Sequence, residues 1–245
     1  MAKGLLRATA HVSAMTLISR ILGFVRDMVI ARLFGASAAA DAFFVAFKIP
    51  NLLRRLTAEG AFSQAFVPVL SEYRSRGDEA EVKHLVERVA GTLFGLLSVL
   101  TVVGVVAAPL LIMAFAPGFI DEGGKFDLAA ALLRVTFPYI LLISLSALAG
   151  AILNSYGRFV VPALMPVFLN LSLIGCAVWL APMLDEPIMA LAWGVFLGGV
   201  LQLILQFPAL RRLGLLPRPR WGWRDAGITG RLRKWGKSNH CQLCG

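Results

Sequence analysis

Long, continuous apolar runs are the feature that most constrains what this 245-residue chain can fold into. A helix needs about 20 mostly apolar residues to cross the roughly 30 Å hydrocarbon core of a bilayer, and several runs are that long. With 58% hydrophobic and only 16% charged residues, the chain has more apolar surface than a soluble domain of this length buries. Because barrel strands would alternate in polarity over short stretches, these runs predict an all-α membrane protein.

The runs predict a bundle of six transmembrane helices, the second of which is interrupted at Pro50. We expect these helices at about residues 10–34, 41–70, 89–115, 128–153, 160–180 and 188–210. Residues 1–212 then form one transmembrane domain, with a polar cytoplasmic loop at 72–88 that has a helical, surface-lying portion. Residues 213–245 read as a basic interfacial or disordered tail. The absence of any apolar period near the C-terminus predicts a truncated or aberrant end.

The charges between the runs alternate in sign from one connection to the next. Lysines and arginines gather at the start, around residues 74–88 and after residue 210, whereas acidic residues gather around 121–127 and 185–186. Because cytoplasmic loops of membrane proteins carry the excess of Lys and Arg, both termini are predicted to be cytoplasmic. The same rule explains the net charge of +10. Nucleic-acid binding is not needed to explain this charge, and no folded basic module that could bind nucleic acid is visible. No cleavable signal peptide is expected, since Arg20 and Arg26 interrupt the first run.

Ionisable residues inside the first predicted helix are candidates for function, because each costs roughly 2.5–3.5 kcal/mol or more to place in a membrane. Polar and small residues recur there at alternating spacings of four and three, which puts them on one helix face, with Arg26 on its flank. This polar stripe consists of Thr9, Ser13, Thr16, Arg20, Gly23 and Asp27. A stripe of this kind is expected to face the bundle interior or a water-filled cavity.

The second predicted helix adds a further group of charges. Asp41, Lys48, Arg55 and Glu59 would share one face of an ideal helix, whereas Arg54 depends on how Pro50 redirects the chain. The planar guanidinium group suits bidentate phosphate binding, so Arg20, Arg26 and Arg54 are candidates for holding a pyrophosphate. The alternative is structural: each arginine pairs with Asp27, Asp41 or Glu59, or reaches an interface.

Other features point to packing. Glycine pairs at 91/95 and 194/198 permit close helix contact, and Asn170 and Ser172 are expected to hydrogen-bond between helices. Cys241 and Cys244 form a CxxC pair without the further ligands of a zinc site. No P-loop, nucleophile elbow or HExxH motif is present. We therefore expect a transporter without a cofactor or metal, not an enzyme.

Several of these segments resemble the MurJ/MviN-type lipid II flippases of bacteria. The first two predicted helices carry most of the likeness, which extends to about Gly227. The matching segments are Ser19–Asp27 (SRILGFVRD), Asp41–Leu56 (DAFFVAFKIPNLLRRL), Glu59–Pro68 (EGAFSQAFVP), Phe137–Ile140 (FPYI) and Gly150–Asn154 (GAILN). The match from Asp41 to Pro68 is long and specific.

The resemblance implies one lobe of a two-lobed exporter fold in the multidrug/oligosaccharidyl-lipid/polysaccharide exporter superfamily. It implies a multi-pass protein of the bacterial inner membrane that moves lipid II, an undecaprenyl-pyrophosphate-linked peptidoglycan precursor, to the outer leaflet by alternating access. Membrane lipids and a C-terminal lobe are the other implied partners. The resemblance assigns Arg20, Arg26 and Arg54 to the substrate. Gating and charge-pairing positions are Asp41, Glu59, Lys48, Asp27 and Arg55.

The chain departs from this family in length, since members have about 14 membrane helices and about twice as many residues. We expect it to correspond to the N-terminal lobe, which cannot rock against a second half when alone. Two alternatives stay open: an inactive truncated fragment, and an exporter of another lipid-linked oligosaccharide. Paired arginines argue against a drug exporter.

Overall fold

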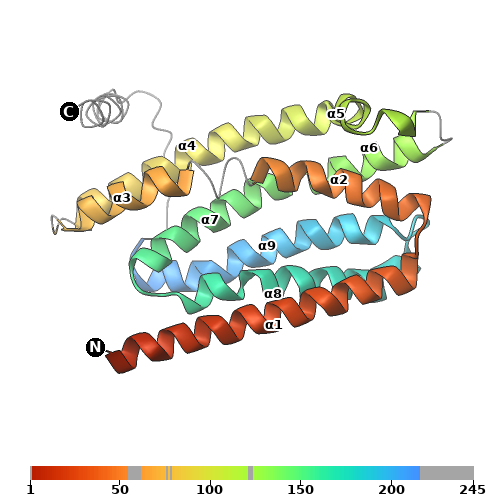
Figure 1. The fold of residues 1–245 in the computed structure, drawn as a ribbon. Coiled ribbons are helices and arrows are strands. Elements are labelled where there is room, and N and C mark those ends of the chain that lie inside the picture. Colours follow the sequence, from red (N-terminus) through yellow and green to blue (C-terminus); the bar gives the residue numbers. More distant parts are fainter. Residues whose placement is uncertain (1, 55–61, 76, 78, 121–123, 216–245) are drawn as a thin grey trace, which may run out of the picture.

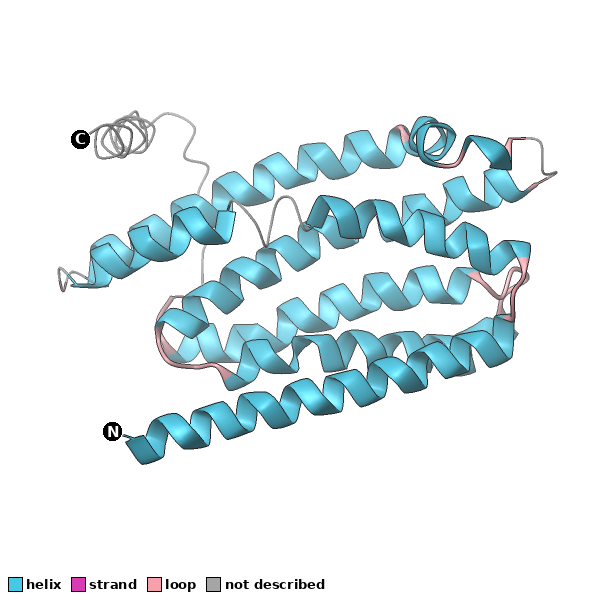
Figure 2. Cartoon of the chain, viewed as in Figure 1, coloured by secondary structure: helices cyan, strands magenta, loops and turns pink. Residues whose placement is uncertain are grey.

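The computed structural model describes residues 2–54, 62–75, 77, 79–120 and 124–215, and within these ranges every regular element is a helix (Figures 1 and 2). The α-helices are α1 (Ala2–Phe34), α2 (Ala38–Arg54), α3 (Phe62–Ser75), α4 (Glu79–Val106), α5 (Ala108–Phe115), α6 (Lys125–Thr136), α7 (Tyr139–Ser155), α8 (Val160–Gly175) and α9 (Met189–Arg212). A π-helical turn, Cys176–Leu180, extends α8. The all-α fold class predicted from the apolar runs is confirmed.

The helices run side by side as an elongated bundle. α8 lies between α1 and α9, α9 also packs against α7, and α2 packs against α6 (Figure 1). The main apolar core joins α2, α6, α8 and α9 around fully buried side chains such as Leu132, Leu133 and Leu191. A second core, around Leu70, Val86 and Leu153, fastens the α3–α4 hairpin to α7.

Four helical stretches among the described residues are long and apolar enough to cross a membrane: Glu79–Val106, Lys125–Ser155, Val160–Met183 and Met189–Arg212. Their outward faces carry exposed apolar side chains, for example Leu96, Val99 and Val103 on α4. An apolar exterior suits lipid and would be unfavourable in water. α1 and α2 are not among the four: α1 carries Arg20, Arg26 and Asp27 close together, and α2 has only 17 residues. The chain is a helical membrane protein, and six passes remain a prediction.

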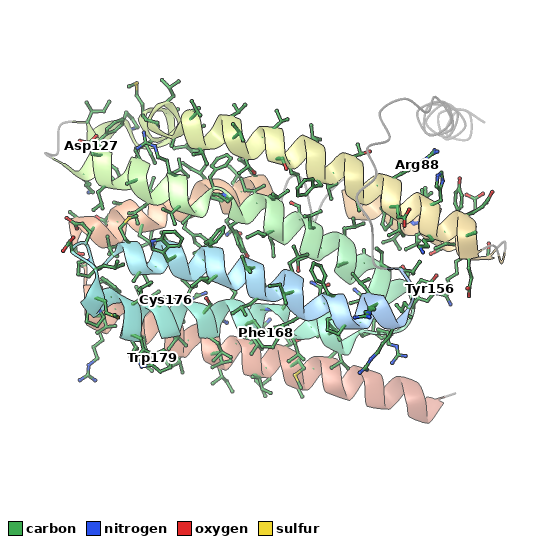
Figure 3. All side chains as sticks on the ribbon, turned by 180° about the vertical axis from the view of Figure 1, so that it is seen from behind. Arg88, Asp127, Tyr156, Phe168, Cys176 and Trp179 are labelled. Atoms are coloured by element: carbon green, nitrogen blue, oxygen red, sulfur yellow. The ribbon has the colours of Figure 1, made fainter. Side chains whose placement is uncertain are left out.

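The two ends of the bundle differ in charge, as the sequence predicts. Asp127 lies at one end, whereas Arg88 and Tyr156 lie at the opposite end (Figure 3). At that opposite end the Arg74 guanidinium donates to the carbonyl of Ser155 and lies 5.0 Å from the centre of the Tyr156 ring. That the end carrying Arg74 and Arg88 faces the cytoplasm stays a prediction.

Two local expectations need correction. The segment 72–88 is more helical than the expected loop with one helical portion, because α3 continues to Ser75 and α4 begins at Glu79. The apolar residues Val82, Leu85 and Val86 recur at helical spacing and are buried, so the polar residues between them occupy only the outer face. Pro50 does not interrupt the second helix either, because α2 continues through it to Arg54.

Close packing of α8 on α9 depends on two glycines. A methyl group added at Gly194 would lie 3.1 Å from the Cα atom of Leu173, and one at Gly198 would lie 2.7 Å from Cδ1 of Leu169. Ser172 adds a hydrogen bond of 2.8 Å from its hydroxyl to the carbonyl of Gly194. The packing role predicted for the glycine pair at 194/198 is confirmed. At Gly95, by contrast, nothing lies within 4 Å.

Candidate substrate cavity

A cavity of about 610 Å³ lies between five helices of the bundle. It follows α7 from Tyr139 to Asn154, a length of about 22 Å at the helical rise of 1.5 Å per residue. Its wall includes Arg26 of α1, Phe47 and Asn51 of α2, Tyr139, Ser146 and Asn154 of α7, Met165 and Leu169 of α8, and Gln202 of α9. Arginine, amide, hydroxyl and aromatic groups in one hollow are typical of a ligand site.

Among the described residues of this wall Arg26 is the cationic group, and its position is fixed by three hydrogen bonds. Nε and Nη2 donate to Oδ1 of Asp27, at 2.9 and 2.7 Å, and Nη1 donates to Oδ1 of Asn170 at 3.0 Å. The side chain is 27% exposed. Because a guanidinium group carries five N–H donors, Arg26 keeps donors for a ligand after these bonds are made.

Asn170 connects this arginine to the backbone of α1. Its Nδ2 donates to the carbonyl of Ser19 at 3.1 Å and lies 3.7 Å from the position of a Cβ atom at Gly23. One asparagine of α8 therefore holds α1 at two points and orients Arg26. This confirms the interhelical role predicted for Asn170.

Arg20 lies on another face of α1. Its side chain is exposed, as are those of Ser13, Thr16 and Asp27, so most of the described polar stripe faces away from the described helices. Arg20 is 14 residues and Arg26 eight residues before the end of α1 at Phe34, which corresponds to about 21 and 12 Å along the helix. The two arginines therefore do not point into the same described cavity.

Lys48 lines a different, smaller cavity of about 360 Å³ between α2 and Phe115. Asp41 lies at the start of α2 and pairs with Lys125, whose Nζ is 3.6 Å from Oδ2 of Asp41. The same ammonium group lies 4.3 Å from the centre of the Phe119 ring. Asp41 therefore joins the beginnings of α2 and α6.

Three of the predicted site positions lie outside the described residues: the side chain of Arg54, and the whole of Arg55 and Glu59. Of the eight predicted site residues, the described part brings only Arg26 and Asp27 into contact.

Three polar residues near the cavity were missed by the sequence reasoning. Gln202 and Gln206 of α9 are 2% and 0% exposed, and Ser146 of α7 is 4% exposed. Gln206 Nε2 donates to the hydroxyl oxygen of Ser146, and Gln202 Nε2 donates to the carbonyl of Met165 at 2.7 Å. The feature of the sequence that could have identified them is the pair Gln202 and Gln206, which lie one helical turn apart in an apolar run.

Together, the apolar exterior and the arginine-bearing cavity define a polytopic helical membrane protein with a polar site inside its bundle. The family model described as "Lipid II flippase MurJ" matches residues 30–238. The chain belongs to this family, and the predicted location, multi-pass in the bacterial inner membrane, is confirmed with it.

Individual relatives agree. The chain is 51% identical over 234 residues to a probable lipid II flippase MurJ of Vibrio cholerae serotype O1, and 49% identical over 234 residues to the lipid II flippase MurJ of Burkholderia cenocepacia. These matches cover 93% and 94% of this chain and 45% of each relative. A solved lipid II flippase MurJ in an inward closed conformation matches with a TM-score of 0.71 at 28% identity, covering 91% of this chain and 45% of that one. The chain thus spans about 45% of the length of the relatives it matches.

Proposed function

We propose that this chain forms the N-terminal lobe of a flippase that moves lipid II from the inner to the outer leaflet of the membrane. The observation that carries the proposal is Arg26, a positioned guanidinium group in the wall of a cavity of about 610 Å³. Its remaining N–H donors suit the oxygens of a phosphate or pyrophosphate. Membership of the lipid II flippase MurJ family supports the same substrate class.

The fixed geometry of Arg26 supports binding rather than a merely structural ion pair. Asp27 is 65% exposed, so the described helices do not enclose this ion pair. Asn170 is uncharged and therefore orients the guanidinium group without neutralising it. An oriented cation in a partly dry cavity attracts a phosphate more strongly than one in bulk water.

Arg20 and Arg54 would complete the anion site in the same proposal. Arg20 is exposed on α1, so it can contribute only if the substrate reaches the outer side of this helix. In the proposed flippase that side faces the second lobe, and Asp41, Lys48, Asp27, Arg55 and Glu59 supply charge pairs that form and break during transport. The second lobe corresponds to the part of the relatives that this chain does not span.

A complementation assay tests the proposal. A bacterium depleted of its own lipid II flippase receives either this chain alone or a fusion of it with the matching second half of a relative. We expect only the fusion to restore growth, because alternating access requires two bodies that move against each other. Arg26→Ala in the fusion should abolish rescue while leaving the amount of protein in the membrane unchanged.

Arg32→Ala is the matched control, because Arg32 is an exposed arginine in the last turn of the same helix and does not line the cavity. We expect this variant to rescue growth as the unmodified fusion does. Rescue by the Arg26→Ala fusion would contradict the anion-binding role. Rescue by the short chain alone would show that a second lobe is not needed.

A further inference from the structure

The cavity wall contains an uncharged polar group besides Arg26. Ser146 and Gln202 both line the cavity, and Gln206 lies directly behind Ser146. All three are at most 4% exposed. Buried polar side chains within membrane helices are costly unless their hydrogen bonds are satisfied, so a cluster of three needs an explanation.

The two glutamines of this cluster donate hydrogen bonds through their amide nitrogens, whereas their amide oxygens have no partner among the described residues. Nε2 of Gln202 donates to the carbonyl of Met165, and Nε2 of Gln206 donates to Ser146 Oγ and, at 3.2 Å, to the carbonyl of Gln202. The Oε1 atoms of both glutamines are buried with no hydrogen-bond partner among the described residues. A buried acceptor without a donor is destabilising, and a ligand donor would recover that cost.

Ser146, in contrast to the two glutamines, offers a hydrogen-bond donor. Its oxygen accepts from Gln206, so its own O–H proton is directed elsewhere and is available to an acceptor in the cavity. Gln202 Oε1 is the complementary acceptor, because Gln202 lines the same wall and this oxygen has no partner among the described residues. A group that both donates and accepts, such as a hydroxyl or a secondary amide, fits this pair.

The position of the cluster relative to Arg26 follows from α8. Asn170 binds Arg26, and Met165, five residues earlier on the same helix, binds Gln202. Five residues correspond to about 7.5 Å along a helix. A ligand whose anionic group lies at Arg26 therefore places its neighbouring chemical group at Ser146 and Gln202.

We propose that Ser146 and Gln202 form a neutral subsite that binds a hydroxyl or amide group of the substrate, next to the anion held by Arg26, with Gln206 positioning Ser146. This inference rests on the proposed function, because it assumes that a polar lipid with an anionic group enters the cavity. The subsite distinguishes a sugar-bearing pyrophosphate lipid from the bare lipid pyrophosphate. Tyr139 and Phe47, with ring centres 6.3 Å apart, add aromatic surface to the same cavity.

A binding experiment on the full chain in lipid nanodiscs tests the subsite. Native mass spectrometry measures the affinity for two probes, undecaprenyl pyrophosphate and lipid II, which differ in the sugar-peptide group. We expect Gln202→Leu and Ser146→Ala each to weaken lipid II binding about tenfold, the value of one net hydrogen bond, and to leave undecaprenyl pyrophosphate binding within about twofold. Ser146→Ala removes a single oxygen atom, so it tests the subsite even if the larger change, Gln202→Leu, prevents the chain from folding.

Ser172→Ala is the control, because Ser172 also makes a hydrogen bond between α8 and α9 but does not line the cavity. It should change neither affinity. If both subsite variants bind lipid II like the unmodified chain, or lose both probes equally, the subsite is refuted. The proposed function would still stand in that case if Arg26→Ala weakened both probes. If the unmodified chain binds neither probe, the subsite is refuted, whereas the proposed function is decided separately by rescue with the fusion.

Discussion

Gly104 of α4 provides a sharp test of how the bundle packs. A methyl group added there would lie 1.9 Å from Cε1 of Phe137, and Phe137 is 1% exposed, so its ring has no space into which to move. Restoring a van der Waals distance of about 3.5 Å requires a displacement of about 1.6 Å. Overpacking of this kind costs about 1–3 kcal/mol. We expect Gly104→Ala to be destabilising despite the higher helix propensity of alanine.

Gly95→Ala isolates the packing effect, because Gly95 is also buried in α4 but has nothing within 4 Å of an added methyl group. Both variants gain about 1 kcal/mol of helix propensity, so their difference reports the overlap with Phe137 alone. At about 2–4 °C per kcal/mol, Gly104→Ala should unfold about 2–12 °C below Gly95→Ala in detergent, followed by tryptophan fluorescence. Equal unfolding temperatures would refute the close contact between α4 and Phe137.

Two further predictions concern charge and orientation. The carboxylate of the Asp41–Lys125 ion pair is 66% exposed, so the pair contributes about 1 kcal/mol or less to the free energy of unfolding. Asp41→Asn should therefore lower the unfolding temperature by no more than about 2–4 °C. A larger fall would contradict this weak contribution. In a background without native cysteines, Glu186→Cys should react with an impermeant maleimide added to intact cells, whereas Arg158→Cys should react only after permeabilisation. The reverse labelling pattern would contradict the predicted orientation.

The apolar helices were predictable because one property, continuous hydropathy, determines both their existence and their ends. The ranges expected at 160–180 and 188–210 agree closely with α8 plus its π-helical turn and with α9. The expected range 128–153 appears as α6 and α7, which are separated at Phe137 and Pro138. Proline lacks an N–H and disfavours helix in the residue before it, so this break could be predicted from the sequence.

The segment 72–88 was predicted to be only partly helical, because its mean polarity conceals a periodic pattern. Val82, Leu85 and Val86 form one buried stripe of α4, but charged residues surround them in the sequence. Average hydropathy reports whether a segment enters the membrane, not whether one of its faces packs on a neighbour. The helical extension of α4 beyond its apolar part therefore needed the structure.

The candidate site shows what helical periodicity cannot decide. The spacing in the first run placed Arg20 at the centre of a polar stripe and Arg26 on its flank, yet Arg26 enters the described cavity and Arg20 does not. The rotation of α1 is set by Asn170, which binds both Arg26 and the Ser19 carbonyl from a helix more than 140 residues away. Periodicity defines a face, but only the partner helix determines which edge of that face meets the cavity.

The same reasoning explains why the glutamines were missed. Gln202 and Gln206 are polar residues in an apolar run, and the meaning of Gln202 depends on Ser146 of α7 and Met165 of α8, neither of which is near it in sequence. Charged residues inside a membrane helix are conspicuous because their burial is so costly, whereas an amide can be satisfied by many ordinary interhelical contacts. The unpartnered Oε1 of Gln202 is what separates it from such contacts. Its assignment to a ligand subsite therefore rests on an unsatisfied acceptor beside a cavity, a property that exists only once three helices are packed together.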